Sequence, residues 1–146
     1  DVFAPFFMEM EGYEWMGKGL EGTYYYPIGG ELEDEGVAFT EVEYRDIIEI
    51  GYLQMFLSGG VIHVFLFLII LVPAAINGIF RSRNLFSKAA GAIIFLWLID
   101  MFVFGIPRLS FHYIFVWISV GICYKESIRS RSDEEIREEF QQIIIE

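Results

Sequence analysis

Residues 50–80 contain no Asp, Glu, Lys or Arg, and this uncharged stretch exceeds the roughly 20 apolar residues that cross a bilayer. The chain as a whole is 55% hydrophobic and carries a net charge of −11. This composition excludes a disordered chain and is untypical of a nucleic-acid-binding protein. The single cysteine excludes a disulfide scaffold and a zinc site built from several cysteines. We therefore expect an integral membrane protein without a nucleic-acid partner.

The pattern predicts an all-α integral membrane fold, in which an outer Gly-rich loop is followed by three transmembrane helices that form part of a larger helical bundle. The first residue is Asp and no signal segment precedes the acidic region, so we expect the chain to be part of a longer protein. The predicted segments are an extracytoplasmic loop (1–39), an interfacial helix continuing into the first transmembrane helix (40–80), a cytoplasmic loop (81–88), a second transmembrane helix (89–107), a third (108–124) and a cytoplasmic acidic tail (125–146), which is expected to form a short helix.

The charges at the ends of the spans predict which side of the membrane each segment faces. Short loops retain Lys and Arg on the cytoplasmic side. Three crossings bring the loop between the first two spans and the segment after the third span to the same side, and both are basic. The basic residues are Arg81, Arg83 and Lys88 in the loop and Lys125, Arg129 and Arg131 after the third span. We therefore expect residues 1–50, whose net charge is −11, to be extracytoplasmic and the C-terminus to be cytoplasmic.

A helix is predicted to begin at Thr40, because Thr40 and Glu43 have the spacing of a capping box. Continued into the first span, this helix would place Arg45, Glu49 and Leu53 on one face. Glu49 is the last charged residue before the apolar stretch, where partial desolvation would suit a general base. The alternative is an ordinary ion pair between Arg45 and Glu49 at the membrane surface, worth about 0.3–0.5 kcal/mol.

The stretch from Glu49 to Gly60 enters the apolar run from the outer side, and it resembles the signature of the bacterial O-antigen ligase and O-antigen polymerase superfamily. In the ligases this signature reads H-N-x-x-L, then six residues, then G. Leu53 and Gly60 stand at the matching positions, whereas Glu49 stands where the ligase histidine would be. Residues 15–25 are similar to the Gly-rich segment that precedes the signature. The glutamate favours a repeat-unit polymerase over a ligase, and the chain corresponds to the C-terminal part of such a protein.

The resemblance implies glycosyl transfer from an undecaprenyl diphosphate-linked oligosaccharide at the outer face of the bacterial cytoplasmic (inner) membrane, as in O-antigen or capsule synthesis. Such a reaction needs a base for the acceptor hydroxyl and cations for the departing diphosphate. Glu49 is the expected base, and Arg45 and Arg108, with Lys18 third, are expected to bind the diphosphate. No cofactor and no metal site are expected, and the acidic run 33–35 is interpreted as a solvated loop. The expected partners are the lipid-linked oligosaccharide and membrane lipid, together with flippase and chain-length regulator proteins.

His63, Asp100 and His112 are polar residues in the outer half of the predicted spans. They could form a relay that supports Glu49 or Arg108, or they could pair between helices as ordinary polar packing, which contributes about 0.6–2 kcal/mol. The alternatives to a polymerase are a ligase of the same superfamily, a non-catalytic membrane assembly subunit, and a transporter, which the three polar residues would suit.

Overall fold

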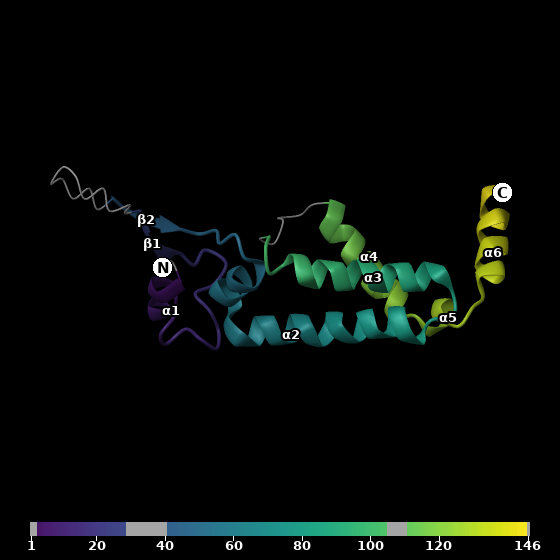
Figure 1. Ribbon diagram of the computed structural model, residues 1–146, viewed down its shortest axis with the longest axis horizontal. Coiled ribbons are helices and arrows are strands. Elements are labelled where there is room, and N and C mark those ends of the chain that lie inside the picture. The colour runs from purple at the N-terminus through teal and green to yellow at the C-terminus, as the bar shows by residue number, and fades with distance from the viewer. Residues whose placement is uncertain (1–2, 29–40, 105–110, 146) are drawn as a thin grey trace.

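The computed structural model describes residues 3–28, 41–104 and 111–145, and these are mostly helical (Figure 1). The elements in chain order are α1 (Phe3–Glu9), β1 (Tyr24–Ile28), β2 (Glu41–Arg45), α2 (Gly51–Arg81), α3 (Leu85–Asp100), α4 (Phe111–Tyr124), α5 (Glu126–Arg129) and α6 (Asp133–Ile145). Helices α2, α3 and α4 pack together as an elongated bundle, with the N-terminal elements at one end and α5 and α6 at the other. The short helix predicted in the acidic tail is present as α6.

The N-terminal segment contains more regular structure than the loop predicted for residues 1–39, because α1 and β1 form within it. β1 and β2 pair antiparallel, with Tyr25 opposite Tyr44 and their ring centroids 6.3 Å apart. The prediction of a helix running through residues 41–45 is wrong, since these residues form β2. Aromatic and β-branched residues favour strands through such cross-strand contacts, and here the pairing outweighs the local capping signal. The fold is therefore not all-α.

Helix α2 is broken at Gly60, whose backbone has φ 63° and ψ −162°, a region that is essentially restricted to glycine. We call residues 51–59 the short arm of α2 and residues 61–81 its long arm. The short arm turns across the end of the bundle toward α3, where the amide of Gly51 donates to the carbonyl oxygen of Met101 at 3.0 Å (Figure 1). A helix leading into the apolar stretch is present, as predicted, but it begins only at Gly51.

The 13–20 loop supplies the hydrogen bonds that α2 loses at its break. Four bonds join them, from the amides of Lys18 and Gly19 to the carbonyl oxygens of Leu57 and Ser58 (2.7 and 3.1 Å), and from the amides of Val61 and Ile62 to those of Glu14 and Trp15 (2.8 and 3.3 Å). Glycines permit this approach, because a Cβ on Gly17 would lie 2.4 Å from the nitrogen of Gly59. A helix can be interrupted in an apolar setting only where such partners satisfy its backbone.

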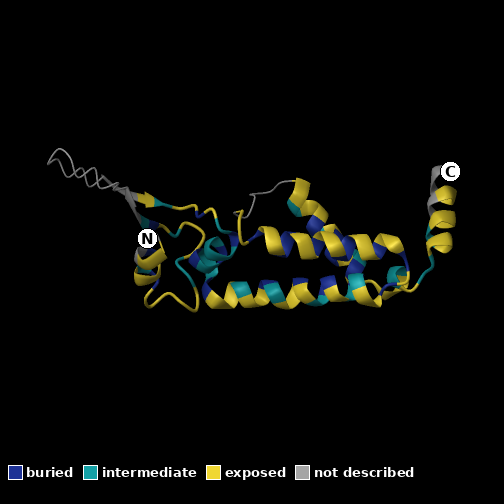
Figure 2. Cartoon of the chain, in the orientation of Figure 1, coloured by how far each residue is buried: buried dark blue, intermediate teal, exposed yellow. Residues whose placement is uncertain are grey.

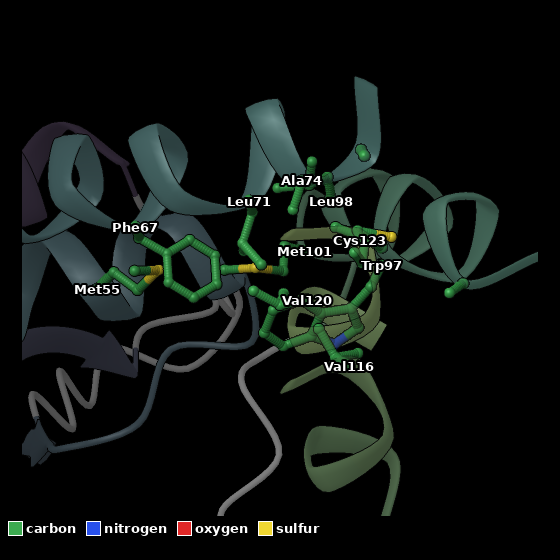
Figure 3. Close-up of a cluster of buried hydrophobic side chains, with 13 residues drawn as sticks. Met55, Phe67, Leu71, Ala74, Trp97, Leu98, Met101, Val116, Val120 and Cys123 are labelled. Carbon is green, nitrogen blue, oxygen red and sulfur yellow. The ribbon is translucent and has the colours of Figure 1, made fainter. Parts of the chain in front are cut away.

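The core of the bundle lies between α2, α3 and α4 (Figure 3). Phe67 and Trp97 pack with ring centroids 5.4 Å apart, and Tyr113 meets Trp97 edge-on at 5.8 Å. Farther along the bundle the backbones of α2 and α3 touch, since a Cβ on Gly91 would lie 2.7 Å from the nitrogen of Ile79. Small residues commonly allow helices to approach this closely in membrane proteins. The buried members of the core are Met55, Phe67, Leu71, Ala74, Ala75, Ala90, Ile94, Trp97, Leu98, Met101, Val116, Val120 and Cys123.

The two groups of basic residues that were predicted to share one side of the membrane lie at one end of the bundle. The amide of Arg83, in the α2–α3 turn, donates to the carbonyl oxygen of Arg129 in α5 at 2.8 Å. The fully buried Asn84 caps α3, and its side-chain amide donates to the carbonyl oxygens of Ile128 (2.7 Å) and Arg131 (3.1 Å). Hydrogen bonds therefore hold the α2–α3 turn against the segment that follows α4.

The outward faces of the bundle are exposed and carry large apolar side chains (Figure 2). In the described part of the chain, α2 is the helix that is long and apolar enough to cross a membrane, and 28% of its most apolar 18-residue window is buried. Helices α3 and α4, with 16 and 14 residues, are shorter than the roughly 20 residues of a typical span. Their exposed apolar residues include Ile93, Phe95, Leu96, Ile99, Phe111, Ile114, Phe115 and Ile118.

Candidate functional site

Glu49 lies in the bend between β2 and α2, and its side chain is exposed. Arg45 is the last residue of β2. The predicted common helix face of Arg45, Glu49 and Leu53 is therefore wrong, because of the three only Leu53 belongs to a helix. Arg45 and Glu49 nevertheless line one cavity together. The bend, and not helical spacing, brings these two side chains to the same place.

The cavity that Glu49 lines, which we call the Glu49 cavity, has a volume of about 490 Å³. Its lining includes one arginine and two acidic residues, Arg45, Asp46 and Glu49, together with two aromatic residues. An Arg can donate two parallel hydrogen bonds to a phosphate, and a carboxylate can accept from a sugar hydroxyl or take up its proton. The cavity therefore combines groups for anion binding, for sugar binding and for proton transfer. Its lining residues are Phe3, Tyr24, Arg45, Asp46, Ile47, Ile48, Glu49 and Ile50.

Gln54, on the short arm of α2, holds the segment that carries both carboxylates. Its side-chain oxygen accepts from the amide of Ile48 at 2.7 Å, and its side-chain nitrogen donates to the carbonyl oxygen of Asp46 at 3.1 Å. The buried cluster beside this segment contains Phe6, Met10, Tyr24, Ile48 and Leu57. Sequence reasoning gave Asp46 and Gln54 no role, since a predicted helix through residue 46 contains no bend for Gln54 to stabilise.

A second cavity, the His63 cavity, has a volume of about 470 Å³ and shares residues 46–48 with the first. One group of its lining residues is polar: Asp46, Gln54, Ser58 and His63. Another group is apolar and lies along α2 and α4: Leu66, Phe67, Ile70 and Trp117. The ring nitrogen Nδ1 of His63 lies 3.4 Å from the hydroxyl oxygen of Ser58. This cavity matches a ligand that has a polar head and an apolar chain.

The three polar residues of the predicted spans are not joined to one another. Among the described residues, no hydrogen bond or ion pair links His63, Asp100 and His112. Asp100 ends α3 and His112 lies in the first turn of α4, and both side chains are exposed. Of the three, His63 lines a cavity that also contains a carboxylate, that of Asp46. The relay therefore stays a prediction, with His63 the member closest to the candidate site.

Lys18 forms an ion pair and a hydrogen bond within the N-terminal segment. Its ammonium group forms an ion pair with Glu9 at 2.9 Å and donates to the carbonyl oxygen of Thr23 at 2.9 Å. The same Glu9 carboxylate accepts from the amide of Tyr25 at 3.0 Å. These bonds tie α1 and β1 to the 13–20 loop and give Lys18 a structural role, while its predicted contact with a diphosphate stays a prediction.

We expect Lys18→Met and Glu9→Gln each to lower the free energy of unfolding, with a coupling energy of up to about 1 kcal/mol in a double-mutant cycle, because each removes the partner of a partly buried charge. Thermal melts of the two single variants and the double variant would measure both the loss of stability and the coupling energy. Lys88→Met, at an exposed position on α3, serves as the control. A Lys18→Met protein that melts normally but binds its ligand poorly would instead support the diphosphate role.

Two further predictions fall on residues outside the described ranges: Arg108 and the acidic run 33–35. Within the described ranges, no group of three or more His, Cys, Asp or Glu side chains could hold a metal ion. The sequence matches no protein-family model, and no curated protein or solved structure is significantly similar to it.

Proposed function

We propose that this chain is part of a membrane glycosyltransferase that polymerises undecaprenyl diphosphate-linked polysaccharide repeat units at the outer face of the bacterial cytoplasmic membrane. The observation that carries the proposal is the presence of Arg45 and Glu49 in one cavity, immediately before the long apolar helix. The reaction needs a cation and a base at this kind of boundary, where the diphosphate of a lipid-linked sugar resides. O-antigen ligase activity is the related alternative, with the same donor and a different acceptor.

The placement in a membrane is supported by what the bundle leaves exposed. A core helix of a soluble protein is mostly buried, whereas only 28% of the most apolar part of α2 is buried. The long arm of α2 spans roughly 30 Å at 1.5 Å per residue, which is the thickness of the hydrocarbon layer. The basic residues at the α5 end favour the cytoplasmic side for that end, so that the Glu49 cavity faces outward. In this placement α3 and α4 complete their crossings with flanking residues.

The chemistry assigned to the Glu49 cavity follows from the charge that develops during transfer. The acceptor hydroxyl loses its proton to the carboxylate of Glu49 while its oxygen bonds to the anomeric carbon of the donor sugar. The bond from that carbon to the diphosphate oxygen breaks, and the diphosphate leaves with the electron pair, stabilised by the guanidinium of Arg45. The carboxylate of Asp46, in the same lining, is suited to hold sugar hydroxyls. The apolar part of the His63 cavity offers a path for the lipid chain.

The direct test is transfer by the purified protein of which this chain is a part, in proteoliposomes supplied with a synthetic undecaprenyl diphosphate oligosaccharide. A ladder of products that differ by one repeat unit would support the polymerase. A single transfer to a lipid A-core acceptor would support the ligase. If the protein neither binds the substrate nor yields any product, the transferase proposal fails.

We expect Arg45→Gln to raise the KM for the lipid-linked donor roughly 10- to 100-fold, because a hydrogen bond to a charged group contributes about 1.5–3 kcal/mol. The measurement is the initial rate against donor concentration in the same proteoliposomes. Arg137→Gln, at an exposed position on α6 at the opposite end of the bundle, is the matched control. Equal kinetics for the two variants would remove Arg45 from the site.

A further inference from the structure

The 13–20 loop exposes several large apolar side chains. The exposed fractions are 51% for Tyr13, 68% for Trp15, 73% for Met16 and 94% for Leu20. None of these residues belongs to either buried cluster of the described chain. Apolar side chains gathered in this way on a single loop indicate a surface that is covered in the working protein.

The loop has a fixed position relative to α2. Its backbone bonds to both sides of the Gly60 break, at Leu57 and Ser58 before it and at Val61 and Ile62 after it. A Cβ on Gly60 would lie 2.4 Å from the carbonyl carbon of Trp15, so the two backbones are in direct contact. Along the long axis of the bundle, the loop therefore lies at the same position as Gly60.

The exposed apolar surface of the long arm begins at the same position along the bundle. Exposed apolar side chains begin at Val61 (44% exposed) and continue through Ile62 and Phe65. From residue 61 the long arm extends roughly 30 Å to Arg81, the thickness of a hydrocarbon layer. A bilayer centred on the long arm thus has its outer hydrocarbon boundary at Gly60. Tyr and Trp are enriched at this boundary in membrane proteins, because their rings combine apolar and polar parts.

The charges of the loop limit how deeply it can enter the membrane. Hydrogen bonds from the backbone amides of Glu14 itself and of Gly12 hold the pKa of the Glu14 carboxyl below its ordinary value, and the Gly12 amide lies 3.0 Å from one carboxylate oxygen. Glu14 is therefore ionised, and the neighbouring Glu11 and Glu21 are exposed. Carboxylates are costly in hydrocarbon, so the loop is restricted to the headgroup region.

We propose that the 13–20 loop is a membrane-interface anchor, which inserts Trp15, Met16 and Leu20 among the lipid headgroups of the outer leaflet. The partner is the lipid surface, which is continuous with the surface that covers the long arm. The inference rests on the membrane placement in the proposed function and is independent of the transferase chemistry. Leu20 also lines the His63 cavity, so the anchored loop brings the edge of that cavity to the lipid surface.

The test is spin-label accessibility in phosphatidylcholine vesicles. The chain has one cysteine, the buried Cys123, so a Cys123→Ala background accepts single labels at chosen sites. Met16→Cys and Leu20→Cys report on the loop, Glu11→Cys is the exposed control beside it, and Phe65→Cys reports on the long arm. The measured quantity is the ratio of collision rates with oxygen, which partitions into lipid, and with a water-soluble nickel chelate.

The anchor predicts ratios at Met16 and Leu20 that are several-fold above the ratio at Glu11 and below that at Phe65. Ratios at Met16 and Leu20 equal to that at Glu11, with a high ratio at Phe65, would overturn the anchor and leave the membrane placement intact. A low ratio at Phe65 as well would overturn both the anchor and the membrane placement on which the proposed function rests.

Discussion

Glu49→Gln is expected to lower the rate of polymer extension roughly 10²- to 10⁴-fold, the usual contribution of a general base. The amide keeps the size and hydrogen-bonding reach of the side chain but cannot take the proton of the acceptor hydroxyl. Because Glu49 is exposed in a bend, the change should leave the melting temperature and the amount of inserted protein unaltered. The measurement is the length distribution of polymer in cells and the initial rate in proteoliposomes.

Two further variants decide how the Glu49 result is interpreted. Glu21→Gln, at an exposed position outside both cavities, should extend polymer normally. Asp46→Asn should raise the KM for the acceptor if Asp46 holds sugar hydroxyls. A larger loss of kcat in Asp46→Asn than in Glu49→Gln would transfer the role of base to Asp46, and polymer of normal length from Glu49→Gln would remove the proposed mechanism.

Gly60→Ala is expected to destabilise the end of the bundle that carries the N-terminal elements by more than about 3 kcal/mol. The backbone conformation alone costs a non-glycine residue about 1–3 kcal/mol. In addition, the new Cβ would lie 2.4 Å from the carbonyl carbon of Trp15, and a backbone atom fixed by hydrogen bonds cannot move aside cheaply. We expect a lower melting temperature in detergent and faster proteolysis within the 13–20 loop.

The matched control is Gly121→Ala, a helical position in α4 where a Cβ meets nothing within 4 Å. This change should be neutral or stabilising by up to about 1 kcal/mol, since Ala favours a helix over Gly. If Gly60→Ala melts like Gly121→Ala and the loop keeps its resistance to protease, then α2 can run without its break, and the 13–20 loop is not required to complete it.

The sequence predicts the long apolar helix well, because a stretch of residues without a formal charge, such as 50–80, is stable only in a lipid bilayer or in a large apolar core. The basic residues after α2 and after α4 lie at one end of the bundle, as the predicted alternation of the helices requires, while the assignment of that end to the cytoplasm stays a prediction. The break at Gly60 was not predicted. Its stability depends on bonds to residues 14–19, far upstream in the sequence, and no local pattern encodes such a pairing.

Arg45 and Glu49 lie together as predicted, but the predicted cause, a shared helix face, is wrong. Arg45 and Glu49 were grouped by helical periodicity, but residue 45 ends a strand whose partner, β1, lies upstream in the sequence. Thr40 and Glu43 carried a capping signal that is valid only if a helix follows. Arg45 and Glu49 still line one cavity, because the bend between them is short. The sequence does not indicate a role for Asp46, since its position in that bend depends on the hydrogen bonds of Gln54.

The buried amide of Asn84 has a consequence for the order of assembly. Its acceptors, the carbonyl oxygens of Ile128 and Arg131, are translated more than forty residues later than Asn84 itself. Until those residues leave the ribosome, the side-chain amide of Asn84 lacks both acceptors, and the α2–α3 turn lacks its contacts with the segment after α4. Closure of this end of the bundle is thus a late step, and a chain stopped after Tyr124 would form its helices without the contacts that fix the α2–α3 turn.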